Sequence, residues 1–135
     1  MGQAKPTNND GAALAGLKVL VVEDMFLVAD VIDMVLQERG CQVVGPVPRL
    51  ERALELARGA PLDGAILDVN LAGELSFPVA AALAARGIPY FFLTGYDDIA
   101  LFPPEYRAQA RLMKPFDDDA LEQMVAREFV REAST

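Results

Sequence analysis

The chain is 135 residues long and 53% hydrophobic, so a single domain can bury a core without a metal ion or a disulfide to stabilise it. Its formal net charge of −8 argues against a nucleic-acid-binding surface, because duplex binding relies on lysine and arginine side chains that neutralise phosphates. Histidine is absent and there is one cysteine, which excludes Ser-His and Cys-His nucleophile pairs, the commonest zinc ligand and an internal disulfide.

The first sixteen residues are rich in glycine, alanine and small polar residues and show no clear period. We therefore expect residues 1–16 to form a flexible arm before one domain at residues 17–135. The arm lacks the basic segment and apolar core of a secretory signal, and no later window approaches the ~20 consecutive apolar residues of a membrane span. These absences predict a soluble, cytoplasmic protein with no membrane partner.

Short apolar runs alternate with segments of helical periodicity along this domain. Strands are predicted at residues 17–22, 41–44, 64–67, 90–93 and 111–113. Helices are predicted to begin at Asp24, Leu50, Ser76 and the aspartates 117–119, and a glycine ends each of the first three. Between residues 97 and 109 the periodicity is poor and Pro103-Pro104 interrupts it, so we expect a short or irregular fourth helix that is mobile.

Strands that alternate with helices predict an α/β fold, in which a parallel sheet is covered on both faces and ligands bind beyond the carboxyl ends of the strands. The polar residues at those ends are Glu23, Asp24, Asp68, Thr94 and Lys114. Taken singly they have ordinary structural explanations, since an aspartate often caps a helix or forms a turn and a surface lysine is solvated.

Taken together, three carboxylates at one edge repel one another by up to about 4 kcal/mol per close pair at an effective dielectric constant of about 20. A bound cation removes that repulsion. Ligands that are all oxygen favour a hard divalent ion such as Mg2+. Magnesium beside a free carboxylate points to phosphoryl transfer.

The order Glu23-Asp24, Asp68, Thr94, Lys114-Pro115-Phe116 resembles the receiver domain of bacterial two-component response regulators, over about residues 17–129. The resemblance implies a doubly wound, flavodoxin-like parallel sheet of strand order 2-1-3-4-5. It also implies that Asp68 accepts a phosphoryl group from a phosphohistidine on a partner histidine kinase or histidine phosphotransfer protein. A chain without histidine cannot itself be that donor.

On the same resemblance, Asp24 and Asp68 bind Mg2+ together with the backbone carbonyl of Asn70, and Glu23 binds the ion through water.

Four further residues receive roles from the resemblance. Lys114 pairs with one phosphoryl oxygen, and Thr94 donates its hydroxyl to another. Gly95 has no side chain, which leaves the phosphate approachable. The peptide before Pro115 is expected to be cis.

More narrowly, the segments DVNLAGE and FFLTGY resemble single-domain receivers of the FATGUY type, which have alanine where this chain has Leu93. Two features depart from the general receiver pattern. Leu71-Ala72-Gly73 replaces a Met-Pro-Gly style loop, and Arg111 stands where many receivers carry the aromatic residue that moves inward with the threonine. Tyr96 is a candidate substitute for that aromatic residue, and Arg111 is otherwise a surface cation near the acidic edge.

These features predict a single-domain response regulator that signals to an unknown downstream protein. It is not expected to be an enzyme beyond Mg-dependent self-phosphorylation from a phosphodonor and slow self-dephosphorylation. One alternative is a phosphate sink that drains a shared kinase, and another is a receiver fold that works without phosphate. A third is a small phosphohydrolase with an Asp68 intermediate, although Asn70 stands where its second carboxylate is needed.

Overall fold

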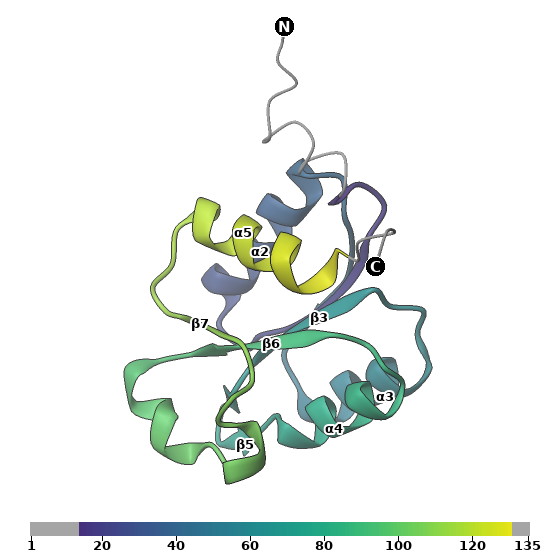
Figure 1. The fold of residues 1–135 in the computed structure, drawn as a ribbon. Helices are drawn as coiled ribbons and strands as arrows, with labels where there is room; N and C mark the ends of the chain where they lie inside the picture. The colour runs from purple at the N-terminus through teal and green to yellow at the C-terminus, as the bar shows by residue number, and fades with distance from the viewer. Residues whose placement is uncertain (1–13, 131–135) are drawn as a thin grey trace, which may run out of the picture.

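Five parallel strands form the central sheet of the computed structural model, which describes residues 14–130 (Figure 1). The strands are β1 (Lys18–Val22), β2 (Gln42–Val47), β3 (Gly64–Asp68), β6 (Tyr90–Thr94) and β7 (Arg111–Met113). Their order across the sheet is β2-β1-β3-β6-β7, and each neighbouring pair is parallel. Numbered in chain order, these five strands run 2-1-3-4-5, which confirms the predicted doubly wound fold.

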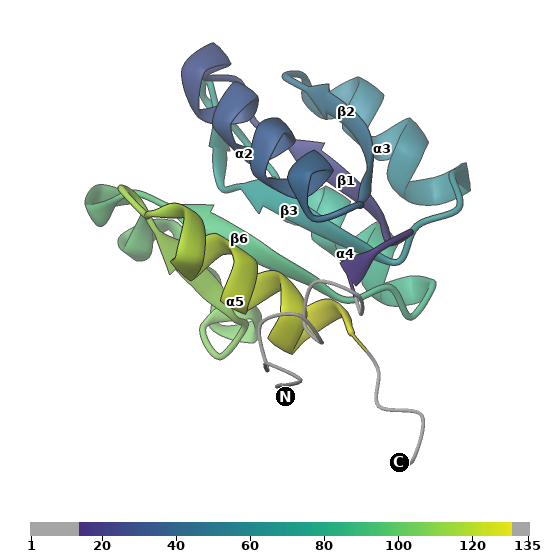
Figure 2. The same ribbon diagram turned by 90° about the horizontal axis from the view of Figure 1, so that it is seen from above.

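Helices cover both faces of the sheet (Figures 1 and 2). On one face lie α2 (Phe26–Glu38) and α5 (Asp118–Phe129), and on the other lie α3 (Leu50–Gly59) and α4 (Phe77–Ala85). Successive strand side chains point to opposite faces, so Val19 and Val21 pack in the cluster under α2 and α5, whereas Leu20 and Val22 pack in the cluster with α3 and α4. Both faces of the central strands β1, β3 and β6 are therefore buried, which explains why these strands are almost continuously apolar instead of alternating with polar residues.

Three of the predicted helix starts can be compared with the N-cap residues in the structure. Asp117 caps α5, because its Oδ1 accepts the Ala120 N–H at 2.8 Å. Ser76 is the N-cap residue of α4 as predicted, yet its hydroxyl makes no cap hydrogen bond. The predicted start of the first helix at Asp24 is early, since Met25 is the N-cap residue of α2. Asp24 therefore lies before the helix, and its carboxylate is free to join the other carboxylates at the ends of the strands.

Two short 3-10 turns, η1 (Tyr96–Leu101) and η2 (Pro104–Tyr106), replace a regular fourth helix, as the proline pair predicted. Proline cannot donate a backbone hydrogen bond, so a continuous α-helix is unfavourable through Pro103 and Pro104. The segment is attached to the sheet by Phe102, whose ring centroid lies 5.2 Å from that of Phe92 in β6. The connection to β7 is therefore an aromatic-anchored loop, coloured green in Figure 1.

The cis peptide expected before Pro115 is present, and a second one precedes Pro46. Most of the predicted flexible arm, residues 1–13, lies outside the described residues. Leu14 is described and fully buried, and its carbonyl accepts the thiol of Cys41 at 3.5 Å. Within residues 14–130, no helix combines the length and the hydrophobicity that a membrane span requires.

Candidate functional site

Three carboxylates converge where β1 and β3 end. Glu23 and Asp24 follow β1 directly, and Asp68 is the last residue of β3, its neighbour in the sheet. One carboxylate oxygen from each of the three lies within 4.8 Å of the others. The structure therefore brings together the acidic residues that the sequence placed at separate strand ends.

Lys114, which follows β7, reaches this cluster from the far side of β6. Its Nζ lies 2.8 Å from Glu23 Oε1 and 3.2 Å from Asp68 Oδ1. The side chain of Glu23 is completely buried and that of Asp68 is 5% exposed. The ammonium group thus supplies positive charge to two carboxylates that have little contact with water.

Burial is the main reason why the pKa of Asp68 is raised to about 8, and the negative charge of Glu23 raises it further while Lys114 opposes the shift. Burial also lowers the pKa of Lys114, but its hydrogen bond with Glu23 and the charge of Asp68 outweigh that effect and leave the pKa above its ordinary value. The cluster therefore holds more negative charge than Lys114 alone neutralises, which is the electrostatic condition for binding a cation.

The donor set fits a hard divalent cation. Glu23, Asp24 and Asp68 offer only oxygen atoms, and one of them, Asp24, keeps part of its surface in contact with solvent. Oxygen ligands, partial hydration and excess negative charge suit Mg2+ rather than zinc or copper.

The hydroxyl of Thr94, at the end of β6, is turned away from solvent. Thr94 is fully buried, and its Oγ1 donates to the Met113 sulfur at 3.1 Å. Thr94 is not among the residues that line the crevice around Asp68, whereas its neighbour Gly95 is. Tyr96, the proposed substitute for an inward-moving aromatic residue, is 85% exposed.

Asn70 shapes the loop after β3. Its Oδ1 accepts the Gly73 N–H at 2.7 Å, in a tight hairpin between β4 (Asn70–Leu71) and β5 (Glu74–Leu75). Both residues at the tip, Ala72 and Gly73, have positive φ, the combination required by a two-residue hairpin turn of the primed type. The side-chain oxygen of Asn70 is therefore occupied by its own turn.

Arg111 contacts two residues of the loop between β6 and β7. Its guanidinium carbon lies 5.1 Å from the centroid of the Phe102 ring, and its Nη1 donates to the Arg107 carbonyl at 3.1 Å. These contacts hold the side chain on the loop that carries η1 and η2, and the interpretation of Arg111 as a cation near the acidic edge stays a prediction.

Sequence reasoning assigned no site role to four residues that line the crevice, Met25, Ala72, Gly73 and Asp98. Asp98 lies in η1, and its Oδ2 accepts the Gly95 N–H at 2.9 Å. A spacing of three residues between a cap position and an acidic side chain is the available signal. It is weak here because Gly95 provides no side chain for the reciprocal bond.

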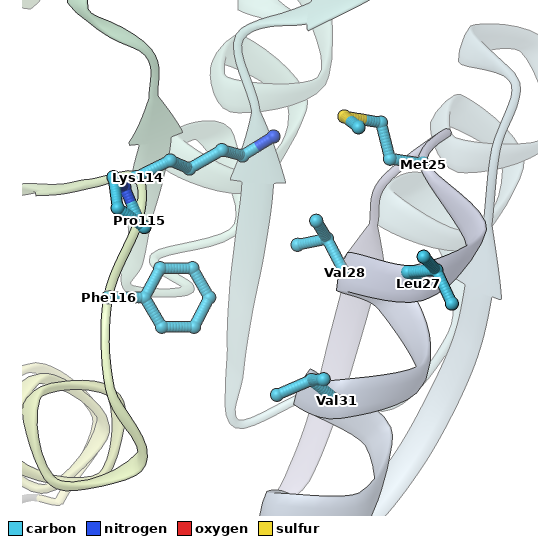
Figure 3. Close-up of a pocket in the computed structure, with 7 residues that line it drawn as sticks. All are labelled: Met25, Leu27, Val28, Val31, Lys114, Pro115 and Phe116. Carbon is cyan, nitrogen blue, oxygen red and sulfur yellow. The ribbon is translucent and has the colours of Figure 1, made fainter.

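An apolar groove adjoins the crevice between the start of α2 and the residues after β7 (Figure 3). Its lining is Met25, Leu27, Val28, Val31, Lys114, Pro115 and Phe116. Val28 and Phe116 face each other across it, and the amino group of Lys114 extends toward the Met25 side. Met25 and Lys114 line both the groove and the crevice, so the two form one continuous surface.

The doubly wound fold and the clustered carboxylates are those of a receiver domain. The family model for the response regulator receiver domain matches residues 19–126. The chain therefore belongs to this family. Receiver domains of response regulators are signalling domains that accept phosphoryl groups and interact with histidine kinases and downstream proteins; they are not enzymes in the usual sense.

Two relatives show how the chain compares in length. The sensory transduction protein LytT of Bacillus cereus is 33% identical over 110 residues, which cover 79% of this chain and 45% of LytT. This chain therefore spans about half the length of the curated relatives it matches. SdrG from Sphingomonas melonis Fr1, known from a solution structure, is 40% identical with a TM-score of 0.72, and the match covers 84% of this chain and 96% of that chain.

A magnesium-bound structure is also similar in fold. The receiver domain of the sensor histidine kinase PA1611 from Pseudomonas aeruginosa has a magnesium ion coordinated in its active-site cleft. The match has a TM-score of 0.70 and 23% identity, and it covers 86% of this chain and 98% of that chain.

Proposed function

We propose that this protein is a single-domain response regulator whose Asp68 accepts a phosphoryl group from a phosphohistidine on a partner histidine kinase or histidine phosphotransfer protein. It then signals by contact with a downstream protein in the cytoplasm. The observation that carries the proposal is the buried carboxylate of Asp68, which lies within 4.8 Å of two further carboxylates and 3.2 Å from the amino group of Lys114.

The ligands proposed for Mg2+ are Glu23, Asp24 and Asp68 with the main-chain carbonyl of Asn70. When bound, the ion would neutralise negative charge between the acceptor and the incoming phosphoryl group. Without it, Asp68 faces the charge of Glu23 at close range, and its raised pKa reduces the fraction of nucleophilic carboxylate at neutral pH.

In the transfer step, an oxygen of the Asp68 carboxylate forms a bond to phosphorus while the phosphorus–nitrogen bond of the phosphohistidine breaks. The donor imidazole keeps the electron pair of that bond and takes up a proton. Lys114, already in contact with Asp68, orients the acceptor and then pairs with a phosphoryl oxygen. With that proton taken from water, atoms and charge balance in the transfer.

Thr94 is proposed to exchange its present partner for a phosphoryl oxygen. A thioether sulfur is a weak acceptor, so leaving Met113 costs little compared with the gain from a charged oxygen. Gly95 and Tyr96 follow Thr94 in the sequence, and Pro115 follows Lys114. All three are retained in the proposal as access and switch positions.

The apolar groove is proposed to receive the protein that carries the phosphohistidine. A donor that reaches Asp68 has to cover Met25 and Lys114, which lead directly into the groove. The adjacent side chains of α2 are strongly exposed for apolar residues, with Phe26 at 78% and Leu27 at 75%. Exposed apolar surface of this kind marks an interaction site, so we expect apolar side chains beside the histidine of the donor.

The FATGUY assignment rests on the segments DVNLAGE and FFLTGY. The match to SdrG, which covers 96% of that chain, supports the single-domain part of the proposal. In contrast, the phosphohydrolase alternative needs a general acid at the position of Asn70, and an asparagine side chain is not an acid. That side chain is also bonded within its own turn.

The proposal is tested by treating the protein with acetyl phosphate and Mg2+ and recording intact mass. We expect wild type to gain the mass of one phosphoryl group, and Asp68→Asn to gain nothing. The control is Asp119→Asn, which removes an exposed aspartate of α5 and should gain the same mass as wild type. Wild type that stays unmodified would refute the proposal.

A binding experiment then separates an output protein from a phosphate sink. A regulator with an output partner binds its target differently in the phosphorylated and unphosphorylated states, whereas a sink shows no such dependence.

A further inference from the structure

Asp98 lies in the crevice of Asp68 without a part in the proposed phosphoryl transfer. It lines the crevice with Asp24, Asp68, Gly95 and Lys114 among others. Its Oδ2 accepts the Gly95 N–H at 2.9 Å, and its own N–H donates to the Gly95 carbonyl at 3.1 Å. These two bonds close the first turn of η1. The Asp98 side chain, which lines the crevice, therefore also holds the backbone between Gly95 and Asp98 in its conformation.

Little else holds the start of η1. None of its six residues is buried, and Tyr96, Ile99 and Leu101 are 85%, 45% and 39% exposed. Isolated 3-10 turns have poor hydrogen-bond geometry and few turns to support them. Phe102, immediately after η1, is 3% exposed within the aromatic cluster. The end of η1 is therefore anchored by packing, whereas its start depends on Asp98.

Phosphorylation changes the charge that faces Asp98. Before transfer the carboxyl group of Asp68 carries at most one negative charge. After transfer that carboxylate is neutral as an acyl phosphate, and the phosphoryl group brings about two negative charges. The crevice, which the Asp98 side chain also lines, thus gains net negative charge in a partly buried setting where charges are poorly screened.

We propose that Asp98 is a positioning residue through which phosphorylation of Asp68 loosens η1. In the unphosphorylated protein its carboxylate holds the start of η1 by accepting the Gly95 N–H. The negative charge gained at Asp68 repels that carboxylate from the crevice, and residues 95–101 lose their cap. This inference rests on the proposed function, because it needs Asp68 to be the acceptor.

Hydrogen exchange measured by mass spectrometry on residues 95–101 tests the inference, with and without phosphorylation by acetyl phosphate. We expect wild type to exchange about fivefold faster in this segment once phosphorylated, the ratio typical of losing one capping side chain. Asp98→Ala has no acceptor and should exchange fast in both states. Asp98→Asn keeps an acceptor without the charge, so it should exchange slowly in both states.

Asp97→Asn is the matched control, since it makes the same charge change one residue earlier at an exposed position. It should respond to phosphorylation as wild type does. Exchange in β1 and α5, measured in the same spectra, verifies that each variant is folded.

The outcomes separate the two proposals. If wild type takes up no phosphoryl group, the proposed function and this inference both fail. If wild type is phosphorylated but residues 95–101 exchange at an unchanged rate, or Asp98→Asn responds as strongly as wild type, the inference alone is overturned.

Discussion

The amino group of Lys114 lies 2.8 Å from Oε1 of Glu23, whose side chain is completely buried. The two residues follow strands that are separated in the sheet by β3 and β6. The ion pair therefore joins the ends of two non-adjacent strands, and the same amino group also contacts Asp68. Besides its proposed role toward the phosphoryl group, Lys114 neutralises the carboxylate of Glu23, which has no contact with solvent.

Replacing Lys114 by methionine should lower the free energy of unfolding by about 3 kcal/mol in the absence of metal, because removing one partner leaves buried charge uncompensated. Added Mg2+ should restore most of that loss, since the cation supplies the missing positive charge. Urea unfolding with and without Mg2+ measures both effects. The control Arg52→Met breaks an exposed ion pair with Glu55 and should change stability by less than about 1 kcal/mol.

Magnesium affinity should rise with pH. Because the pKa of Asp68 is raised to about 8, the carboxyl group is mostly protonated below that pH, and Mg2+ has to displace the proton. Affinity should therefore increase by about tenfold per pH unit between about pH 6 and pH 8, and level off above. Calorimetric titration over this range measures it. Asp68→Asn has no such proton, so its weaker binding should not depend on pH; a flat wild-type profile would contradict the prediction.

The sheet and the acidic site were predictable because they depend on local signals. Apolar runs bounded by glycine and proline locate the strands, and the parallel topology then brings Glu23, Asp24 and Asp68 to one edge. The position of Asp117 at the start of α5 followed from a capping preference of the same local kind.

Side-chain partners in the loop after β6 were not predictable, because they depend on how a non-periodic segment packs. Thr94 bonds to Met113 on the neighbouring strand, and sequence alone does not tell which rotamer it adopts. Asp98 enters the crevice only because η1 turns back toward Gly95. The partners of Arg111 were not predictable for a similar reason, since Phe102 and Arg107 belong to the same loop.

The contact of Arg111 with Phe102 should stabilise this loop. A cation over an aromatic face contributes about 0.5–1 kcal/mol at a partly exposed site. We expect Arg111→Met to lose about that much unfolding free energy in wild type and almost none in a Phe102→Leu background. A double-mutant cycle by urea unfolding measures this coupling, and additive losses would contradict it. Phosphorylation from acetyl phosphate should be unaffected, because Arg111 does not line the crevice.

Replacing Leu27 by serine should slow phosphoryl transfer from a protein donor while leaving acetyl phosphate labelling unchanged. Leu27 is 75% exposed on the wall of the groove, and burying such a side chain contributes about 1.5 kcal/mol or more, which corresponds to about tenfold in rate or affinity. Acetyl phosphate is too small to reach the groove from Asp68.

The matched control is Leu101→Ser, an exposed leucine of η1 outside the groove, which should leave transfer from the protein donor at the wild-type rate. Transfer is followed by intact mass, from a phosphorylated histidine phosphotransfer protein that is active toward wild type. Equal transfer rates for wild type and Leu27→Ser would show that the donor approaches Asp68 without contacting the groove.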